Sequence, residues 1–437
     1  MFQFQTGIRG RITSILKRSS YCLLANMTSL CTPRLDNAGA FDHVNGAELR
    51  GLVAGLIQKD ADSHHVFFNS QGFHNHLVHL LLADYSLGAS ENRLKEIYEI
   101  ESPSQRPKLP EKSDFVWSSD HCLGHEEYYT SYLNFFLEQI KSKGVRACIE
   151  EYIFRDDATN MYARFFSGVY HPFIHIGYGV EFGIPMLVAE GLAQTAVHGT
   201  TLVPLYSVTS PIDKKTASGS STTATNIALS TRDDHRFDDI VKWEDSPKIK
   251  ALLQRKPDLV REHVDKWIVS ETLDRPTGLR ARATELQALA AALYAGPQRP
   301  GKQITIDFFL MHAFTSSLFV HSYIEFLNPR YGAALLRGKF AVDLAYYISR
   351  NRPLLNLEQF KSYPLKSWSE IISKAISHGD SHVPKSIRAV KHAAAYDTTI
   401  PSEIYQAIAT ITVDPDRKWS SDGIGFDEEW QDVPDKI

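Results

Sequence analysis

Four apolar segments of the 437-residue chain each contain a histidine that could bind a metal ion. An imidazole buried among apolar side chains must find partners for its ring nitrogens, and a metal ion is one such partner. These histidines are His76, His171, His312 and His382. The alternative at each position is a core histidine that is hydrogen-bonded to a backbone carbonyl. The sequence alone leaves both interpretations open.

Neighbouring residues extend this set of candidate ligands. His79 lies one helical turn after His76, and His175 lies four residues after His171, which is the spacing by which one helix supplies two ligands. Lys385 follows His382 by three residues, and Pro384 suits the first turn of a helix. Because no cysteine and few paired carboxylates lie nearby, the predicted site is rich in imidazole, which suits Fe, Zn, Cu or Ni.

The other histidines lie in more polar contexts, or are expected to point away from this site. We interpret the polar ones as surface or capping residues: His64, His65, His121, His125, His198, His235, His378 and His392. His74 is expected to point away from the face shared by His76 and His79. The remaining apolar one, His321, lies with His312 in a single long helix predicted over 304–326.

Motifs of the common redox and hydrolytic folds are missing from the sequence. Gly177-x-Gly179-x-x-x-Gly183 has one residue too many for a dinucleotide fingerprint and does not follow a strand. The chain has no G-x-S-x-G elbow and no P-loop. Any oxidation must therefore use a centre other than a Rossmann-bound cofactor.

The elements that would position these histidines are helices. In the first, apolar residues recur at helical spacing from Leu77 to Tyr85, Gly88 is a suitable C-terminal residue, and Ser90 is a suitable cap for the next helix. Alternating strand patterns are scarce along the chain, and no repeat is visible. The sequence predicts a mostly α fold, with a single large helical domain built around a central histidine-rich metal site.

The predicted domain spans residues 38–437 and carries a polar loop insertion at 207–236. Serine, threonine and glycine dominate its centre, so residues 210–232 are expected to lie outside the core. Residues 1–37 are expected to form an N-terminal extension outside the core. Its arginines without any acid before Asp36 resemble an organellar transit peptide, and the alternative is an extended start with Met27 as another initiator.

Composition excludes several classes of protein. Hydrophobic residues make up 43% of the chain and charged residues 22%, and the net charge of −4 gives no basic footprint for nucleic acid. No apolar run approaches the roughly 20 residues that span a bilayer. The four cysteines form no C-x-x-C pair, which predicts a reducing, intracellular (cytoplasmic) location. The sequence gives no oligomeric state.

The segments around these histidines resemble the questin oxidase-like family of fungal polyketide pathways, and the resemblance covers most of residues 38–435. The segments that carry it are Phe68–His76, His171–Phe182, His312–Ser317, His382–Ala389 and Trp419–Trp430. Members of this family are oxygenases of secondary metabolism, also described as Baeyer–Villiger oxidases, that open the central ring of anthraquinones toward benzophenones or xanthones. The resemblance therefore implies an anthraquinone and dioxygen as partners.

The resemblance also implies a mononuclear non-heme iron site, held by four histidines and a lysine carboxylated on its side-chain nitrogen. Carried over to this chain, the Fe(II) ligands are His76, His171, His312, His382 and carboxylated Lys385. Lys391 is a rival for the carboxylated position because it lies in the same helix. NADPH could serve as an external reductant.

Other side chains in these segments are candidates for supporting roles. Tyr178 and Glu181 are candidate proton-handling groups, and Thr315 is a candidate partner for the outer nitrogen of a histidine. Two other functions remain open at this stage. One is a non-catalytic helical protein that binds flat aromatic metabolites, and the other is a zinc metallohydrolase.

Overall fold

The computed structural model describes residues 46–155, 160–206, 222–275 and 277–431, and these residues are mostly helical. The only strands among them are β1 (Thr305–Asp307) and β2 (Lys418–Ser420), which pair in parallel with Ile306 opposite Trp419. The predicted mostly α fold class is confirmed. Within the described part of the chain, no helix is long and apolar enough to cross a membrane.

The described residues group into two compact units. Unit 1 contains the residues up to Thr200 together with Glu325–Leu327 and Ile376–Arg388, and unit 2 contains the rest. The N-terminal extension predicted for residues 1–37 lies outside the described residues, so the predicted domain boundaries stay a prediction.

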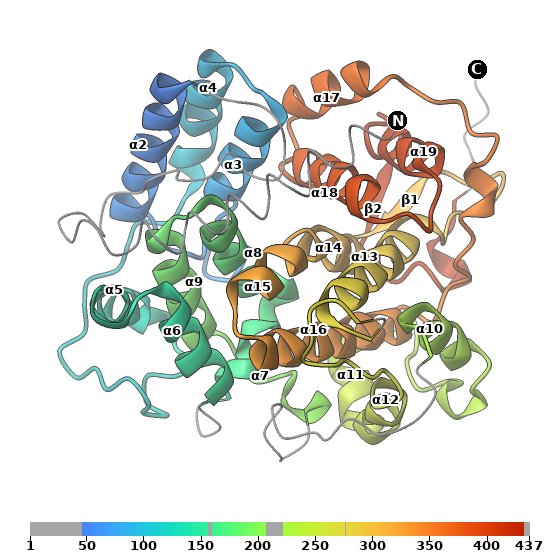
Figure 1. The fold of residues 1–437 in the computed structure, drawn as a ribbon, viewed down its shortest axis with the longest axis horizontal. Helices are drawn as coiled ribbons and strands as arrows, with labels where there is room; N and C mark the ends of the chain where they lie inside the picture. Colours follow the sequence, from blue (N-terminus) through green and yellow to red (C-terminus); the bar gives the residue numbers. More distant parts are fainter. Residues whose placement is uncertain (1–45, 156–159, 207–221, 276, 432–437) are drawn as a thin grey trace. The chain divides into compact units, whose positions relative to one another are not determined.

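Unit 1 is built from helices and short helical turns. In chain order they are α2 (Ala47–Ser63), α3 (Leu77–Leu87), α4 (Glu91–Glu101), η1 (Ser102–Ser104), η2 (Glu126–Tyr128), α5 (Tyr129–Lys143), α6 (Val145–Ile149), the π-helical η3 (Glu150–Arg155), α7 (Met161–Phe165), α8 (Ser167–Phe182) and α9 (Pro185–Val197). Helices α2, α3 and α4 pack against one another, and α8 packs along α9 (Figure 1).

The local signals around α3 behave as expected. Every residue of α3 is buried, the helix ends at Gly88 with φ of 93°, and the Ser90 hydroxyl accepts a hydrogen bond from the Arg93 amide at the start of α4. Gly179, whose motif has one residue too many for a dinucleotide fingerprint, lies inside α8. A Cβ atom there would approach the backbone nitrogen of Val188 to 2.9 Å, so this glycine allows α8 and α9 to pack closely.

Unit 2 is also built mostly from helices, and α15, α17 and α18 each have part of their residues in unit 1. The elements are η4 (Val203–Leu205), α10 (Ala224–Arg232), η5 (His235–Phe237), α11 (Lys248–Arg255), α12 (Pro257–Val264), α13 (Leu279–Ala295), α14 (Phe308–Ser317), α15 (Val320–Phe326), α16 (Pro329–Ser349), η6 (Glu358–Phe360), α17 (Trp368–Ile376), α18 (His382–Tyr396), α19 (Ser402–Thr412) and η7 (Asp427–Glu429).

The single helix predicted over 304–326 is wrong. Residues 305–307 form β1 instead, and the Asp307 carboxylate accepts hydrogen bonds from the amides of Phe309 and Leu310, which starts a new helix, α14. A second break separates α14 from α15. Apolar content alone could not reveal these boundaries, because all three segments are mostly buried.

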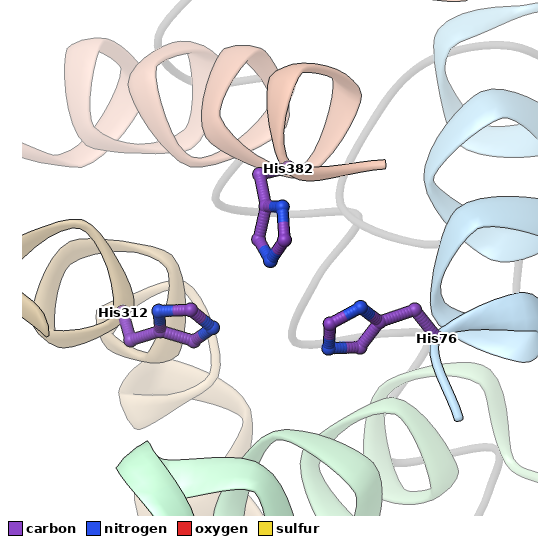
Figure 2. A group of neighbouring side chains, drawn as sticks. All are labelled: His76, His312 and His382. Carbon is purple, nitrogen blue, oxygen red and sulfur yellow. The ribbon is translucent and has the colours of Figure 1, made fainter. Parts of the chain in front are cut away.

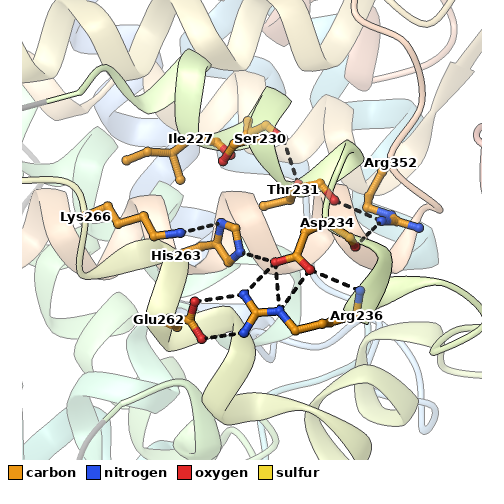
Figure 3. A network of polar contacts seen from close by, with 10 residues as sticks. Ile227, Ser230, Thr231, Asp234, Arg236, Glu262, His263, Lys266 and Arg352 are labelled. Atoms are coloured by element: carbon orange, nitrogen blue, oxygen red, sulfur yellow. Dashed lines mark hydrogen bonds and ion pairs between the residues drawn. The ribbon is translucent and has the colours of Figure 1, made fainter.

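The predicted polar loop at 207–236 is wrong over its second half, whereas residues 207–221 lie outside the described residues. Helix α10 occupies residues 224–232, with the side chains of Ile227 and Ala228 buried. The acidic segment after it is also structured (Figure 3). Asp234 accepts hydrogen bonds from Arg236 at 2.7 Å and from His263 of α12 at 2.9 Å, and Arg236 reaches Glu262. Contacts with α12 therefore order residues that look like loop in sequence.

A buried carboxyl group in α3 makes stability depend on pH. Asp84 is fully buried, neither of its oxygens has a hydrogen-bond partner among the described residues, and the nearest cation, the Arg93 Nε, lies 3.8 Å away. Burial raises the pKa of the Asp84 carboxyl to about 8. Since the folded-state pKa lies above the unfolded value of about 3.9, folding takes up a proton between these two pH values.

We expect Asp84→Asn to abolish this dependence. The free energy of unfolding of the unsubstituted protein should fall, relative to that of the variant, as pH rises from about 4 to about 8, by up to about 1.4 kcal/mol per pH unit. Urea unfolding at pH 5 and pH 8.5 measures the difference. Asp62→Asn, at an exposed position in α2, is the control and should show no such trend. Parallel pH profiles for the unsubstituted protein and Asp84→Asn would contradict this prediction.

Candidate metal centre

Two of the candidate ligands in unit 1 meet directly. His76 is the residue that caps the N-terminus of α3, and its Nε2 lies 2.7 Å from Nε2 of His171 in α8. Burial, and next the charge of Lys385, hold the pKa of both imidazoles well below the usual value. Both rings are therefore neutral at pH 7, which is the form that binds metals.

A strained turn in the backbone orients His171. Gly168, Val169 and Tyr170 all have left-handed φ values, between 54° and 64°. For valine this conformation is a genuine outlier, and such strain is concentrated at functional sites. The turn brings the carbonyl of Gly168 to 2.6 Å from Nδ1 of His171, so Nδ1 carries the proton and Nε2 keeps its lone pair. No sequence pattern predicts this turn.

Two further histidines support His171. The ring of His74 stacks on that of His171 with centroids 3.7 Å apart, and its Nε2 lies 2.9 Å from Nε2 of His198. A Cβ atom on Gly168 would collide with both His74 and His198, so glycine is required there. The expectations that His74 points away and that His198 is a surface residue are wrong. His65 and His392, also assigned to the surface, are buried.

His382 and Lys385 come from the first turns of α18, where Pro384 takes the place expected for it. The Asp380 carboxylate accepts a hydrogen bond from Nδ1 of His382 at 2.8 Å, which leaves Nε2 as the lone-pair nitrogen. Figure 2 shows the rings of His76 and His382 pointing toward one another, and one ring nitrogen of each lies within 4.8 Å of the other. His312, also drawn there, belongs to unit 2.

Lys385 is the unusual member of this group. Its side chain is 5% exposed, and burial lowers the pKa of its ammonium to about 7. Its charge contributes to lowering the pKa of His76 and of His171. Lys391, its rival, is partly exposed.

His79 and His175 form a separate arrangement. The Nε2 of His79 lies 3.1 Å from Nδ1 of His175, and Nε2 of His175 lies 3.0 Å from a carboxylate oxygen of Glu190 in α9. All three side chains are buried. The Nε2 of His175 is engaged by a buried carboxylate, whereas the Nε2 of His171 meets only another candidate ligand, His76. His171 is therefore the better ligand of this pair.

Tyr178 and Glu181 lie farther along α8. The ring of Tyr178 stacks on His79 with centroids 5.1 Å apart, and burial raises the pKa of its phenol. Glu181 forms an ion pair with Arg388 of α18. Tyr178 therefore keeps its proton at neutral pH, and the carboxylate of Glu181 is engaged by a cation.

In unit 2, His312 lies in α14, and its Nδ1 lies 2.7 Å from the carbonyl of Phe308, one turn earlier. The sequence had suggested that Thr315 holds this nitrogen, and that interpretation is wrong. The Thr315 hydroxyl donates instead to the carbonyl of His312, because that carbonyl lies one turn below it in the same helix.

The tautomers of these histidines test whether a metal fits. His171, His312 and His382 each have an oxygen acceptor at Nδ1, which is the outer partner that metal-bound histidines usually have. Within unit 1, His76 and His171 are neutral imidazoles, His382 presents its Nε2 lone pair, and Lys385 is an amine that loses its proton near neutral pH. This donor set fits a first-row transition metal such as iron.

Comparisons with known proteins agree with one another. The questin oxidase-like family model matches residues 73–390. A protein named Baeyer-Villiger oxidase ptaJ, from Pestalotiopsis fici, is 30% identical over 419 residues, covering 87% of this chain and 92% of the relative. A protein named questin oxidase, from Aspergillus fumigatus, is 29% identical over 448 residues, covering 92% and 97%. Another questin oxidase, from Aspergillus terreus, is 28% identical and covers 86% and 91%.

Proposed function

Because the chain belongs to the questin oxidase-like family, and is an oxidoreductase, we propose that it is a non-heme iron oxygenase that cleaves the central ring of an anthraquinone. The reaction would be a formal Baeyer–Villiger-type oxidation in fungal polyketide metabolism, leading toward benzophenones or xanthones. Questin, the compound in the names of two relatives, is the first substrate to test.

One observation carries the iron proposal: the group of His76, His171, His382 and Lys385 in unit 1. His171 and Lys385 are buried, His76 and His382 are partly buried, and Nε2 is left as the lone-pair nitrogen of His171 and His382. These four residues would hold the metal, together with His312, which the family resemblance adds to the set. Bound Fe(II) would supply electrons and a coordination position for dioxygen.

Lys385 would act as an anionic ligand after carboxylation. With a pKa of about 7, Lys385 is a free amine in a large fraction of the protein molecules at neutral pH. The nitrogen lone pair forms a bond to the carbon of carbon dioxide, one C=O electron pair moves to oxygen, and one amine proton passes to solvent. The resulting carbamate carries one negative charge, which would offset part of the charge of a divalent cation.

The surrounding side chains fix the orientation of the imidazole rings. His74 and the strained turn at residues 168–170 hold the His171 ring, and Asp380 holds that of His382. The Tyr178 phenol can hold a proton beside His79 without ionising. These groups give the site a fixed geometry before substrate enters.

Electron balance defines the role of NADPH. Insertion of one oxygen atom from dioxygen reduces the other atom to water, which consumes two electrons from an external reductant. NADPH would be that reductant. Incorporation of both oxygen atoms into the product would need no reductant, so the stoichiometry distinguishes the two types of chemistry.

The deciding experiment is metal analysis combined with oxygen-18 incorporation. We expect about one iron per chain and oxygen-dependent ring opening of questin, with label from dioxygen in the product. Protein that contains zinc and hydrolyses a substrate without dioxygen would favour the metallohydrolase. Metal-free protein that binds questin unchanged would favour the binding protein. Either result would overturn the proposal.

A further inference from the structure

A buried arginine in α18 contacts both of the other helices that carry candidate ligands in unit 1. Arg388 is fully buried. Its Nε donates a hydrogen bond to the Ser86 hydroxyl of α3 at 2.9 Å, and its Nη2 donates to the carboxylate of Glu181 in α8. Its guanidinium lies over the ring of Phe182 at 5.1 Å and over that of Tyr178 at 5.5 Å.

The positions of these partners along their helices are regular. Ser86 follows His76 by ten residues, and Glu181 follows His171 by ten, so each lies roughly 15 Å along its helix from the candidate ligand. Arg388 follows His382 by six residues, or roughly 9 Å. The contact therefore joins α3, α8 and α18 at a place that is several helical turns away from the candidate ligands on α3 and α8.

The segment that carries His382 and Lys385 depends on such contacts because it is far in sequence from the rest of unit 1. At its start, Arg93 of α4 donates hydrogen bonds to the carbonyls of Ile376 at 2.8 Å and His378 at 3.3 Å. At its end, Arg388 provides the contacts described above. Two arginines thus fix both ends of Ile376–Arg388 within unit 1.

We propose that Arg388, with Glu181 and Ser86, forms a positioning clamp that sets the placement of His382 and Lys385 relative to His76 and His171. Glu181 would then serve the site through Arg388, as a partner that fixes α18, and not as a proton-transfer group. The proposal rests on the proposed metal site. A clamp for ligand geometry should affect metal affinity even in a variant whose stability is unchanged.

The test compares two variants: one without the Arg388–Glu181 ion pair, and one without the hydrogen bond from Arg388 to Ser86. Removing one charge alone would leave its buried partner uncompensated and unfold the protein, so we choose Arg388→Met/Glu181→Met, since apolar replacement of both members of a buried pair is often neutral for stability. Ser86→Ala removes only the tether to α3. The probes are Fe(II) alone, titrated anaerobically into apo protein, and the visible spectrum of the Co(II) form.

For both variants we expect a melting temperature near that of the unsubstituted protein, Fe(II) affinity about 10-fold to 100-fold weaker, and an altered Co(II) spectrum. Matched controls lie in unit 2. Arg282→Met/Glu285→Met replaces an ion pair in α13 whose arginine is buried and whose glutamate is partly buried. Ser349→Ala removes a buried serine hydroxyl in α16. Both controls should bind Fe(II) as the unsubstituted protein does.

Unchanged Fe(II) affinity and an unchanged Co(II) spectrum in Ser86→Ala would overturn the clamp and leave the metal site standing. If the double variant fails to fold, Ser86→Ala alone decides. If the unsubstituted protein binds neither metal, the proposed function fails first and the clamp fails with it.

Discussion

Replacing Lys385 with alanine is expected to abolish oxygenase activity. The substitution removes the only proposed anionic ligand, and loss of even an outer-sphere partner typically costs 10-fold to 100-fold, so we expect a decrease of more than about 100-fold in kcat. Oxygen consumption with questin, and iron content per folded chain, measure the effect. Added bicarbonate or a small carboxylic acid should partly restore activity by occupying the vacated position.

Lys385→Arg separates carboxylation from charge. Arginine keeps its positive charge and cannot be carboxylated, so this variant should be as inactive as the alanine variant. Carbon-13 NMR of protein exchanged with labelled bicarbonate should show a carbamate signal that Lys385→Ala loses and Lys391→Ala retains. Full activity in Lys385→Arg would refute the assignment and transfer the role to Lys391.

The sequence could predict the helices, and could indicate which histidines are candidate ligands, because both depend on local patterns. The stripe from Leu77 to Tyr85 and the signals at Gly88 and Ser90 act within a few residues, and all of them lie in the structure where expected. The spacing of Lys385 from His382 is similarly local, since both lie in the first turns of α18.

What the sequence could not predict depends on distant residues. His198 contacts His74 across 124 positions, and its polar neighbours in sequence gave no sign of burial that lowers its pKa to about 3. Arg352 donates a hydrogen bond to the carbonyl of Thr231, 121 residues away, at the end of the helix that had looked like loop. The left-handed turn before His171 is maintained by packing, against the preference of Val169.

The ion-pair partner of Glu181 is also a feature that the sequence could not predict. A glutamate beside a tyrosine on a histidine-rich helix suggests proton transfer when only its own helix is known. The guanidinium that engages it comes from Arg388, 207 residues later. Only the fold shows that this carboxylate is occupied by an ion pair.

His171→Ala should lower iron content whereas His175→Ala should leave it unchanged, although the two histidines lie one turn apart in α8. His171 directs Nε2 at His76 while Gly168 occupies Nδ1, so its loss removes a ligand, and we expect iron content to fall by at least about 10-fold. His175 has both ring nitrogens engaged, by His79 and Glu190. Its loss should leave iron bound in the folded protein.

The cost of His175→Ala should appear as stability instead. Glu190 is 4% exposed and would be left without its imidazole partner, so we expect destabilisation of about 1–3 kcal/mol. Adding Glu190→Gln should recover part of this loss, because the amide carries no charge to be buried. Metal analysis of folded protein and urea unfolding measure the two effects separately. Loss of iron from His175→Ala with retention in His171→Ala would reverse the assignment, and would place the metal between His79 and His175.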